Sequence, residues 1–444
     1  MRSRISGAAA VCALALVVAG APGGTASAER GRDGVGRQVL PAKDGWAAFS
    51  TGTTGGAAAA ADHVFVVSNR QQLVAALGGD NATNGANATP KIVLVDRTIQ
   101  GNVDDDNRPL TCDAYRDPGF TLAAYLATFD PAVWGKKPVA GPLEDARHRS
   151  EKNQGARVQI RVGPNTTIVG IGRHARMIGV NLLVQNVDNV IVRNIDFENA
   201  FDCFPQWDPN DGASGNWNST FDNISLTGAR HVWIDHDSFT DGDHPDSLNP
   251  SFFGREFQVH DGELDITKGA DLVTVSWSAF REHDKTMLIG STDNPALDAG
   301  KLRVTLHHDL FEGIGQRTPR VRFGQVHVFD NLYDVDAPAT YLYSWGVGVQ
   351  SAIFAQDNFF EVPASVAPAR FITVFGGAAI HATGTLVNGR SERDEVDVVA
   401  AYNAAHTPAL GTDVGWTPVL FRRIDPAQSV PARVGEGAGA GRLG

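Results

Sequence analysis

A short β-rich run recurs along the middle of the chain and limits the folds open to it. Each copy is rich in Val, Ile or Leu, continues into a polar stretch and ends on an aromatic residue; the copies lie at 190–197, 232–239, 272–280, 304–311 and 326–333. The final aromatic residues are roughly 20 to 40 positions apart, a spacing typical of solenoid coils joined by loops of unequal length. Because stacked coils share one core, we expect an all-β, single-domain, right-handed parallel β-helix. A β-sandwich with recurrent strands is the alternative.

The length of 444 residues is too great for one compact core, but a solenoid escapes that limit. A strand pattern at 64–67 and a short capped helix over 69–77 open the folded domain, which we expect over 63–444 and mainly as β after residue 77. Insertions at 208–217 and 244–260 are predicted to project on one side and to wall a groove for an extended polymer.

Two segments precede this domain. Residues 1–28 have the pattern of a secretory signal, with Arg2 and Arg4 before an apolar stretch and cleavage expected after Ala28. That stretch is shorter than the roughly 18 residues of a membrane span, so we expect a secreted, extracellular protein without a membrane partner. Residues 29–62 are rich in Gly and Ala without steady periodicity, which predicts a flexible lead-in outside the core.

Composition excludes several classes of protein. With 42% hydrophobic and 20% charged residues, the chain is not largely disordered. The formal charge of −12 argues against a nucleic-acid partner bound through a global positive field, and a polyanionic substrate would need a local basic patch. After signal removal only Cys112 and Cys203 remain, too few for a structural zinc site, and one disulfide between them is possible in an oxidising compartment.

Polar residues that could carry chemistry are concentrated in a few segments. The densest are 261–291 and 316–324, supported by Trp233-Ile234-Asp235-His236 and by 204–209. Together these segments resemble the pectate lyases of polysaccharide lyase family one, and the resemblance extends from about Val64 to the stretches at 414–418 and 438–441. It implies a secreted, calcium-dependent pectate lyase that cleaves α-1,4-polygalacturonate by β-elimination to 4,5-unsaturated oligogalacturonates. A solenoid with capped ends is stable alone, so we expect a monomer.

β-Elimination on a uronate requires removal of a weakly acidic C5 proton beside a carboxylate, whose charge opposes the carbanion. Calcium held by oxygen ligands can neutralise that carboxylate and stabilise the developing charge. Asp261 and Asp265 can lean to the same side if the chain turns at Gly262, and the resemblance adds Asp208 as a third ligand. The predicted calcium ligands are therefore Asp208, Asp261 and Asp265.

The resemblance also assigns the base to Arg317, the first arginine of an Arg-x-Pro-x-x-Arg pattern. An arginine side chain is normally protonated, so this role requires nearby positive charge that disfavours the protonated form, which calcium, Lys285 and Arg322 could supply. Lys285 and Arg322 are expected to hold substrate carboxylates, Arg322 by a bidentate fork and Lys285 by a point contact. Arg320 adds positive potential.

Other polar groups are interpreted as structural. Two acidic clusters, 104–106 and Asp241 with Asp243 and Asp246, are expected to form turns, although a second calcium remains an open alternative there. Trp233-Ile234-Asp235-His236 is assigned to packing. His307 and His308 are assigned structural roles because adjacent strand residues point to opposite faces and cannot easily clamp one ion.

Three other functions remain to be distinguished from a pectate lyase. A pectin lyase acts on methylated pectin without calcium and would lack the carboxylate set. A polygalacturonase would need paired carboxylates as acid and base, and no Gly-His-Gly segment typical of those hydrolases occurs. A non-catalytic β-helix that binds acidic polysaccharide would not need Arg317.

Overall fold

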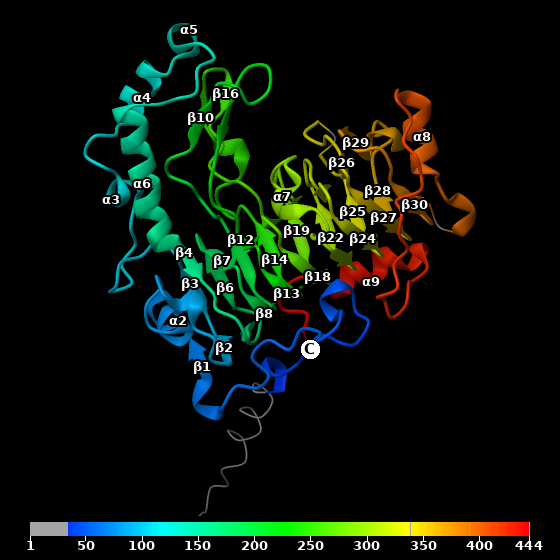
Figure 1. Ribbon diagram of the computed structural model, residues 1–444, viewed down its shortest axis with the longest axis horizontal. Helices are drawn as coiled ribbons and strands as arrows, with labels where there is room; N and C mark the ends of the chain where they lie inside the picture. Colours follow the sequence, from blue (N-terminus) through cyan, green and yellow to red (C-terminus); the bar gives the residue numbers. More distant parts are fainter. Residues whose placement is uncertain (1–33, 338, 390, 444) are drawn as a thin grey trace, which may run out of the picture.

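The computed structural model describes residues 34–337, 339–389 and 391–443, and it is a parallel β-helix built from three long sheets (Figure 1). All strand pairs within these three sheets are parallel, so the all-β solenoid expected from the recurrent runs is confirmed. The ten-stranded sheet contains, in order, β1 (Val64–Val67), β2 (Lys91–Val95), β5 (Thr166–Gly170), β8 (Asp188–Arg193), β13 (Arg230–Asp235), β18 (Asp271–Ser276), β21 (Val304–His307), β24 (Gln325–Phe329), β27 (Ala352–Gln356) and β30 (His381–Thr383).

The other two sheets complete each coil. The nine-stranded sheet contains β3 (Thr98–Gln100), β6 (Arg176–Ile178), β9 (Asp196–Glu198), β14 (Ser238–Thr240), β19 (Ala279–Arg281), β22 (Leu310–Glu312), β25 (Leu332–Asp334), β28 (Phe359–Glu361) and β31 (Leu386–Val387). The eight-stranded sheet contains β29 (Ile372–Phe375), β26 (Trp345–Gly348), β23 (Arg320–Val321), β20 (Leu288–Ile289), β17 (Leu264–Thr267), β12 (Ile224–Thr227), β7 (Asn181–Gln185) and β4 (Gln159–Arg161).

The recurrent runs are consecutive coils in register. One valine near the start of each run pairs with the next across the ten-stranded sheet: Val190, Val232, Val273, Val304 and Val326. Their closing aromatic rings stack along the interior with centroids 4.7 to 5.3 Å apart: Phe197, Phe239, Phe280, Phe311 and Tyr333. Each ring therefore buries its faces against the coils before and after it, which is the shared core that a solenoid requires.

A lobe with its own aromatic core projects from the β-helix (Figure 1). This aromatic lobe comprises α3 (Cys112–Tyr115), α4 (Leu122–Thr128), α5 (Pro131–Trp134), α6 (Pro142–Val158) and two hairpins, β10 (Gln206–Asp208) with β11 (Asn216–Asn218) and β15 (Ser251–Phe252) with β16 (Arg255–Glu256). The two insertions thus project together, as predicted. The expectation of mainly β structure after residue 77 is wrong for 112–158, because this segment buries aromatic and helix-facing side chains in the lobe and not in the coils.

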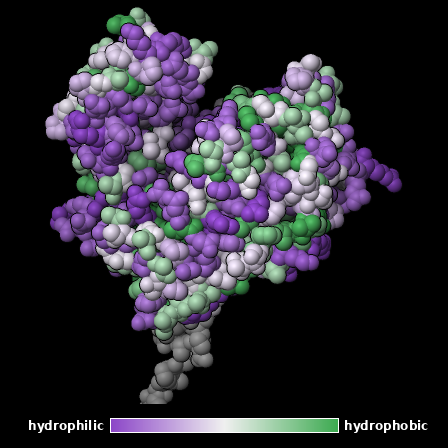
Figure 2. All heavy atoms as spheres, viewed as in Figure 1, coloured by the Kyte–Doolittle hydropathy of each residue, from purple (hydrophilic) through white to green (hydrophobic). Residues whose placement is uncertain are grey.

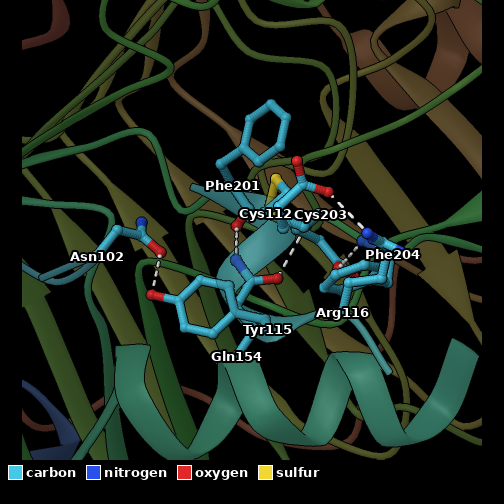
Figure 3. The surroundings of a disulfide bond; sticks show 10 residues. Asn102, Cys112, Tyr115, Arg116, Gln154, Phe201, Cys203 and Phe204 are labelled. Carbon is cyan, nitrogen blue, oxygen red and sulfur yellow. Dashed lines mark hydrogen bonds and ion pairs between the residues drawn. A yellow bond between two sulfur atoms is a disulfide. The ribbon is translucent and has the colours of Figure 1, made fainter. Parts of the chain in front are cut away.

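A disulfide fastens the lobe to the chain that enters it. Cys112 and Cys203 are joined, with an S–S distance of 2.04 Å, so α3 is linked to the segment before β10 (Figure 3). Gln154 of α6 reinforces this junction, because its amide donates to the Phe201 carbonyl at 2.6 Å and accepts from the Cys203 N–H at 2.9 Å. The disulfide that the sequence left open is therefore formed.

The segment expected to be a flexible lead-in instead packs on the ten-stranded sheet from residue 34 onward. Ala47, in the turn η1 (Trp46–Ala48), is fully buried, and its N–H donates to the Thr274 hydroxyl at 3.0 Å. The Gly56 N–H donates to the Thr167 hydroxyl at 2.8 Å, and a Cβ at Gly56 would lie only 1.9 Å from the Lys91 carbonyl oxygen. The small residues of this segment therefore allow its main chain to lie close to the strands. Residues 1–28, the expected signal, lie outside the described residues.

Helices and turns complete the ends of the solenoid and its surface. The helix α2 (Arg70–Leu77) follows β1 and buries Leu73 and Leu77 completely. The helix α8 (Val398–Ala405) follows the last coils, whereas α9 (Val430–Gly437) packs Val430 and Val434 against the nine-stranded sheet. The tail then continues to the earlier coils, where the Gly441 N–H donates to Asn194 at 2.7 Å. The remaining elements are η2 (Ala61–His63), η3 (Asn84–Ala86), η4 (Asp246–Leu248), α7 (Pro295–Asp298), η5 (Pro368–Arg370), η6 (Glu392–Asp394) and η7 (Ala427–Ser429). Among the described helices, none is both long and apolar enough to cross a membrane.

Candidate active site

Three carboxylates converge where β12 and β17 begin. Asp222 lies two residues before β12, Asp261 three residues before β17, and Asp265 within β17, where it pairs with Ser225 of β12. Between them, the Gly262 N–H donates to Asp222 Oδ1 at 3.0 Å. A Cβ at Gly262 would lie 2.7 Å from Asp265 Oδ1 and 3.0 Å from Asp222 Oδ1. Two carboxylate oxygens from adjacent coils therefore point at the same glycine, which only a residue without a side chain accommodates.

The electrostatics of this cluster show that its negative charges are crowded. Burial and then the charge of Asp261 raise the pKa of Asp265 to about 7, and the positive charge of Arg317 partly offsets both. Burial, followed by the charges of Asp265 and Asp261, holds the pKa of Asp222 well above its ordinary value. A positive charge placed among these carboxylates would relieve both effects.

The donor set fits a hard divalent cation. All three side chains supply carboxylate oxygens, the ligands that calcium prefers, and neither His nor Cys belongs to the set. Lys285 already provides one positive contact, with its Nζ 3.1 Å from Asp261 Oδ1. The convergence of Asp222 and Asp265 oxygens on Gly262 is the structural observation that favours calcium here.

The structure does not bring Asp208, one of the expected ligands, into this cluster. Asp208 is the last residue of β10, on the aromatic lobe, where it pairs with Asn216 and its Oδ1 accepts from the Asn210 N–H at 2.8 Å. In the described part of the chain, no hydrogen bond or ion pair joins Asp208 to Asp261 or Asp265. The hairpin carries Asp208 away from the coils because Trp207 beside it is buried in the lobe. Among the described residues, the structure therefore sets Asp222, and not Asp208, beside Asp261 and Asp265.

Asp222 is the carboxylate that sequence reasoning missed. A signal for it was present, because the runs at 224–227 and 264–267 align as successive coils with Ile224 opposite Leu264. This alignment sets Asp222 beside Gly262, next to Asp261. The coil repeats considered in the sequence were those of the ten-stranded sheet, so the weaker repeat of the eight-stranded sheet was not used.

The predicted cationic residues lie on the next coils of the same sheet. Lys285 forms a parallel bridge with Gln316, and the Met287 N–H donates to the Arg317 carbonyl at 2.9 Å, so Lys285 and Arg317 occupy neighbouring coils. Arg317 has a positive φ of 63°, and its Nε is buried without a hydrogen-bond partner among the described residues. Arg317 also influences Tyr343, because burial raises the pKa of this phenol while the positive charge of Arg317 partly lowers it.

The two further arginines differ in their surroundings. Arg322 Nε lies 2.7 Å from Asp293 Oδ1, and its Nη1 donates to the Gly290 carbonyl at 2.9 Å. The Arg322 side chain is largely buried but Asp293 is largely exposed, so a substrate carboxylate can replace Asp293 as the partner of Arg322. The guanidinium of Arg320 lies 3.8 Å from the centre of the Phe375 ring, which holds it against that ring. Asp261, Asp265, Lys285, Arg317 and Arg322 thus lie on neighbouring coils of one sheet.

The cluster lies between two projections of the molecule. In the eight-stranded sheet, β12, β17, β20 and β23 are flanked by β7 and β4 on one side and by β26 and β29 on the other. Figure 2 shows a hollow between the aromatic lobe and the part of the chain around β26 and β29. An extended polymer lying in this hollow crosses successive strands and meets the carboxylates and cations in turn.

The acidic cluster around Asp241 is more than a turn. His283 Nδ1 lies 2.9 Å from Asp241 Oδ1, its Nε2 donates to the main-chain carbonyl of Asp261 at 2.8 Å, and His260 contacts Asp246 at 3.2 Å. Burial alone would lower the pKa of His283, but Asp241 outweighs it and holds this pKa well above its ordinary value. The network fixes the main chain that carries Asp261. The other acidic cluster, at 104–106, forms the expected turn, with Asp104 accepting from two N–H groups.

The two adjacent histidines correct one step of the sequence argument. His308 has a positive φ of 57°, which ends the strand alternation, so the Nδ1 atoms of His307 and His308 lie 3.0 Å apart instead of on opposite faces. Burial lowers the pKa of His308 to about 4. Asp235, of the Trp-Ile-Asp-His segment, is buried and bonded to Arg193, Ser276 and His236, which agrees with a structural role.

Comparison with known proteins identifies the family of this chain. The family model described as pectate lyase matches residues 141–395, which span the coils that carry all the site residues described above. The chain belongs to the pectate lyase family. It is 47% identical over 413 residues to a pectate lyase of Bacillus subtilis (strain 168), covering 92% of this chain and 94% of that protein.

Solved structures extend the likeness to the fold. The structure of a thermostable pectate lyase, PL 47, superposes with a TM-score of 0.90 at 50% identity and covers 92% of this chain and all of that one. A pectate lyase bound to a hexasaccharide superposes with a TM-score of 0.86 at 46% identity, with the same coverage of both chains. As a member of the pectate lyase family, the protein is a polysaccharide lyase.

Proposed function

We propose that this pectate lyase is a calcium-dependent enzyme that cleaves α-1,4-polygalacturonate by β-elimination. We also propose that the protein is exported from the cell and that it is a monomer. The observation that carries the proposal is the convergence of Asp222, Asp261 and Asp265 beside Lys285 and Arg317. Membership of the family supports the reaction class, and the carboxylate cluster supports the metal.

Calcium held by Asp222, Asp261 and Asp265 would neutralise a uronate carboxylate and make the adjacent C5–H more acidic. Around it, the chain supplies positive groups that orient the substrate. Arg322 is suited to a bidentate contact with a uronate carboxylate, because its present partner Asp293 is exposed and replaceable. Lys285 offers a second, single contact beside Asp261.

Arg317 is the proposed base. In its neutral form it takes the C5 proton, the electron pair of that C–H bond forms the C4=C5 double bond, and the C4–O4 bond breaks. The departing O4 keeps the bonding pair and takes up a proton, which gives one new chain end and one unsaturated non-reducing end. The buried Nε of Arg317, which has no hydrogen-bond partner among the described residues, and the position of Arg317 on the coil next to Lys285 support the role.

The decisive experiment follows the ultraviolet absorbance of the unsaturated product during incubation with polygalacturonate. Parallel reactions contain calcium or excess chelator, and a third uses highly methylated pectin. The proposal requires absorbance that rises on polygalacturonate with calcium and not with chelator. A calcium-independent rise on methylated pectin would indicate a pectin lyase and contradict the metal assignment. Reducing ends that form without a rise in absorbance would indicate hydrolysis.

Export and oligomeric state need separate measurements. If residues 1–28 act as a signal, mass spectrometry of the protein recovered from the culture medium will find a chain that begins at Glu29. A cell-associated chain that begins at Met1 would contradict this. Light scattering of the purified protein at several concentrations tests the monomer, and a mass that grows with concentration would exclude it.

A further inference from the structure

The substrate-binding surface has a second basic position at the far edge of the eight-stranded sheet. Register across the sheet sets one outward-facing residue of each strand in a row: Arg161 on β4, Leu183 on β7, Ser225 on β12 and Asp265 on β17. Arg161 is thus three strand spacings, about 14 Å, from the proposed calcium ligand Asp265. Lys285 and Arg317 follow on the next coils in the other direction, so a polymer crossing these coils continues toward β4.

Arg161 borders two hollows at this edge of the sheet. One, of about 620 Å³, extends from Arg161 along the end of α6 to Thr220 and Phe221, the residues that immediately precede Asp222. The other, of about 460 Å³, lies between Arg161, Gln185 and the turn around η3. Both hollows therefore leave Arg161 open to a ligand, and the second one reaches Leu183, its neighbour in the row that leads to Asp265.

The charge of Arg161 is not neutralised by the protein. Its Nη1 donates to Gln185 Oε1 at 3.1 Å, and within the described ranges it forms no ion pair with a carboxylate. Three acidic residues border the larger hollow: Asp105 is paired with Arg157 and Glu151 with Arg147, each at 2.7 Å, and Asp80 accepts the Ala82 N–H at 2.9 Å. Lys152, exposed beside them, adds a further cation. In a chain of net charge −12, such an unpaired arginine on the substrate face favours an anionic ligand.

We propose that Arg161 forms a distal subsite that binds the carboxylate of a uronate residue several sugars from the bond that is cleaved. The inference rests on the proposed function, because polygalacturonate presents one carboxylate on every sugar. An arginine fork binds a carboxylate through two parallel hydrogen bonds, and Arg161 can keep its contact with Gln185 while doing so. The subsite makes the enzyme favour long substrates over short ones, which cannot reach from the cluster to β4.

The test compares polygalacturonate with trigalacturonate. For Arg161→Ala, the ratio of kcat/KM on the polymer to kcat/KM on the trisaccharide is expected to fall about tenfold, through KM on the polymer. Arg161→Lys keeps the charge and loses the fork, so the same ratio is expected to fall less in this variant. The matched control is Arg230→Ala, which removes an exposed arginine on the ten-stranded sheet and leaves the ratio unchanged.

Calorimetry in the presence of calcium separates this inference from the function on which it rests. Hexagalacturonate is titrated into Arg317→Ala and into the double variant that also carries Arg161→Ala; weaker binding by the double variant supports the subsite even if turnover by the parent enzyme proves absent. An unchanged ratio with unchanged calorimetric affinity would overturn the subsite. Equal losses on polymer and trisaccharide would also overturn it, because they would place Arg161 at the reacting sugars.

Discussion

At the scale of single residues, Asp222 and Asp208 offer the sharpest test of the calcium site. Asp222→Asn removes one of three converging carboxylates, so the calcium concentration that gives half-maximal activity is expected to rise at least tenfold, on the order of 1.4 kcal/mol or more of lost binding. Asp208→Asn, a matched change on the β10–β11 hairpin, is expected to leave it unchanged.

The measurement is a calcium titration of the initial rate, repeated as direct calorimetric binding of calcium without substrate. A calcium response that shifts in Asp208→Asn and not in Asp222→Asn would restore the ligand set inferred from the sequence.

Sequence patterns could predict part of the site at this scale. Asp261 and Asp265 were found because they flank a glycine in one short segment, and the structure places both beside it. Asp222 belongs to another coil, 39 positions earlier than Asp261, and only the register between β12 and β17 makes them neighbours. Such a pairing between distant positions has no local signature. The prediction that His307 and His308 point to opposite faces was wrong for a local reason. The positive φ of His308 ends the alternation of side chains along the strand, on which that prediction rested.

At the scale of elements, the disulfide is predicted to stabilise the aromatic lobe. Cys112 and Cys203 are 91 residues apart, so their bond closes a long loop, and its loss is expected to cost about 2–4 kcal/mol of local stability. In Cys112→Ser with Cys203→Ser, hydrogen exchange should quicken in α3, α6 and β10 and stay unchanged in the strands of the ten-stranded sheet. Uniformly faster exchange throughout the chain would show instead that the lobe and the β-helix unfold together.

A second prediction at this scale concerns Asp330, which links the C-terminal segment to the end of β24. The Asp330 carboxylate accepts from the Asp425 N–H at 2.9 Å. Burial raises the pKa of Asp330 to about 8; the charges of Asp425 and Asp357 also raise this pKa, and the charge of Arg433 lowers it. His308, 3.6 Å away, has its pKa lowered to about 4 and is neutral at higher pH.

Because the folded-state pKa of Asp330 lies above that of an unfolded aspartate, about 3.9, the folded chain holds an extra proton between these pH values. Its contribution to stability therefore falls as pH rises from about 4 to about 8, by about 1.4 kcal/mol for each pH unit in this interval. Asp330→Asn cannot lose that proton, and asparagine tolerates the positive φ of 56° found here. Urea unfolding at pH 5 and pH 8 should show a smaller loss of stability in the variant; parallel losses would contradict the prediction.

Elements were predictable where their pattern repeats. The coils of the ten-stranded sheet were found because five copies share one alternation and one closing aromatic residue. The lobe helices occur once and pack on aromatic residues from distant hairpins. The sequence of 112–158 therefore contains no repeat from which this packing could be predicted. The segment at 34–62 misled because Gly and Ala, which suggest flexibility, also permit the closest approach between main chains.

At the scale of the whole molecule, calcium is predicted to stabilise the folded chain. A ligand present at a hundred times its dissociation constant, and bound only by the folded state, adds about 2.7 kcal/mol. Differential scanning calorimetry should therefore show an unfolding midpoint a few degrees higher with calcium than with chelator, and Asp222→Asn should lose most of this difference. An unfolding midpoint of the parent protein that is the same with calcium and with chelator would argue against a calcium site in the folded chain.

The parallel register of the coils has a consequence for how this surface can change. Neighbouring strands are held about 4.8 Å apart by main-chain hydrogen bonds, which no side-chain replacement alters. Along the solenoid axis, the positions of cations and carboxylates are therefore separated by whole multiples of one strand spacing. Substitutions can change which side chain occupies a position, and loops can change what covers it. The positions themselves shift only when an entire coil is inserted or deleted.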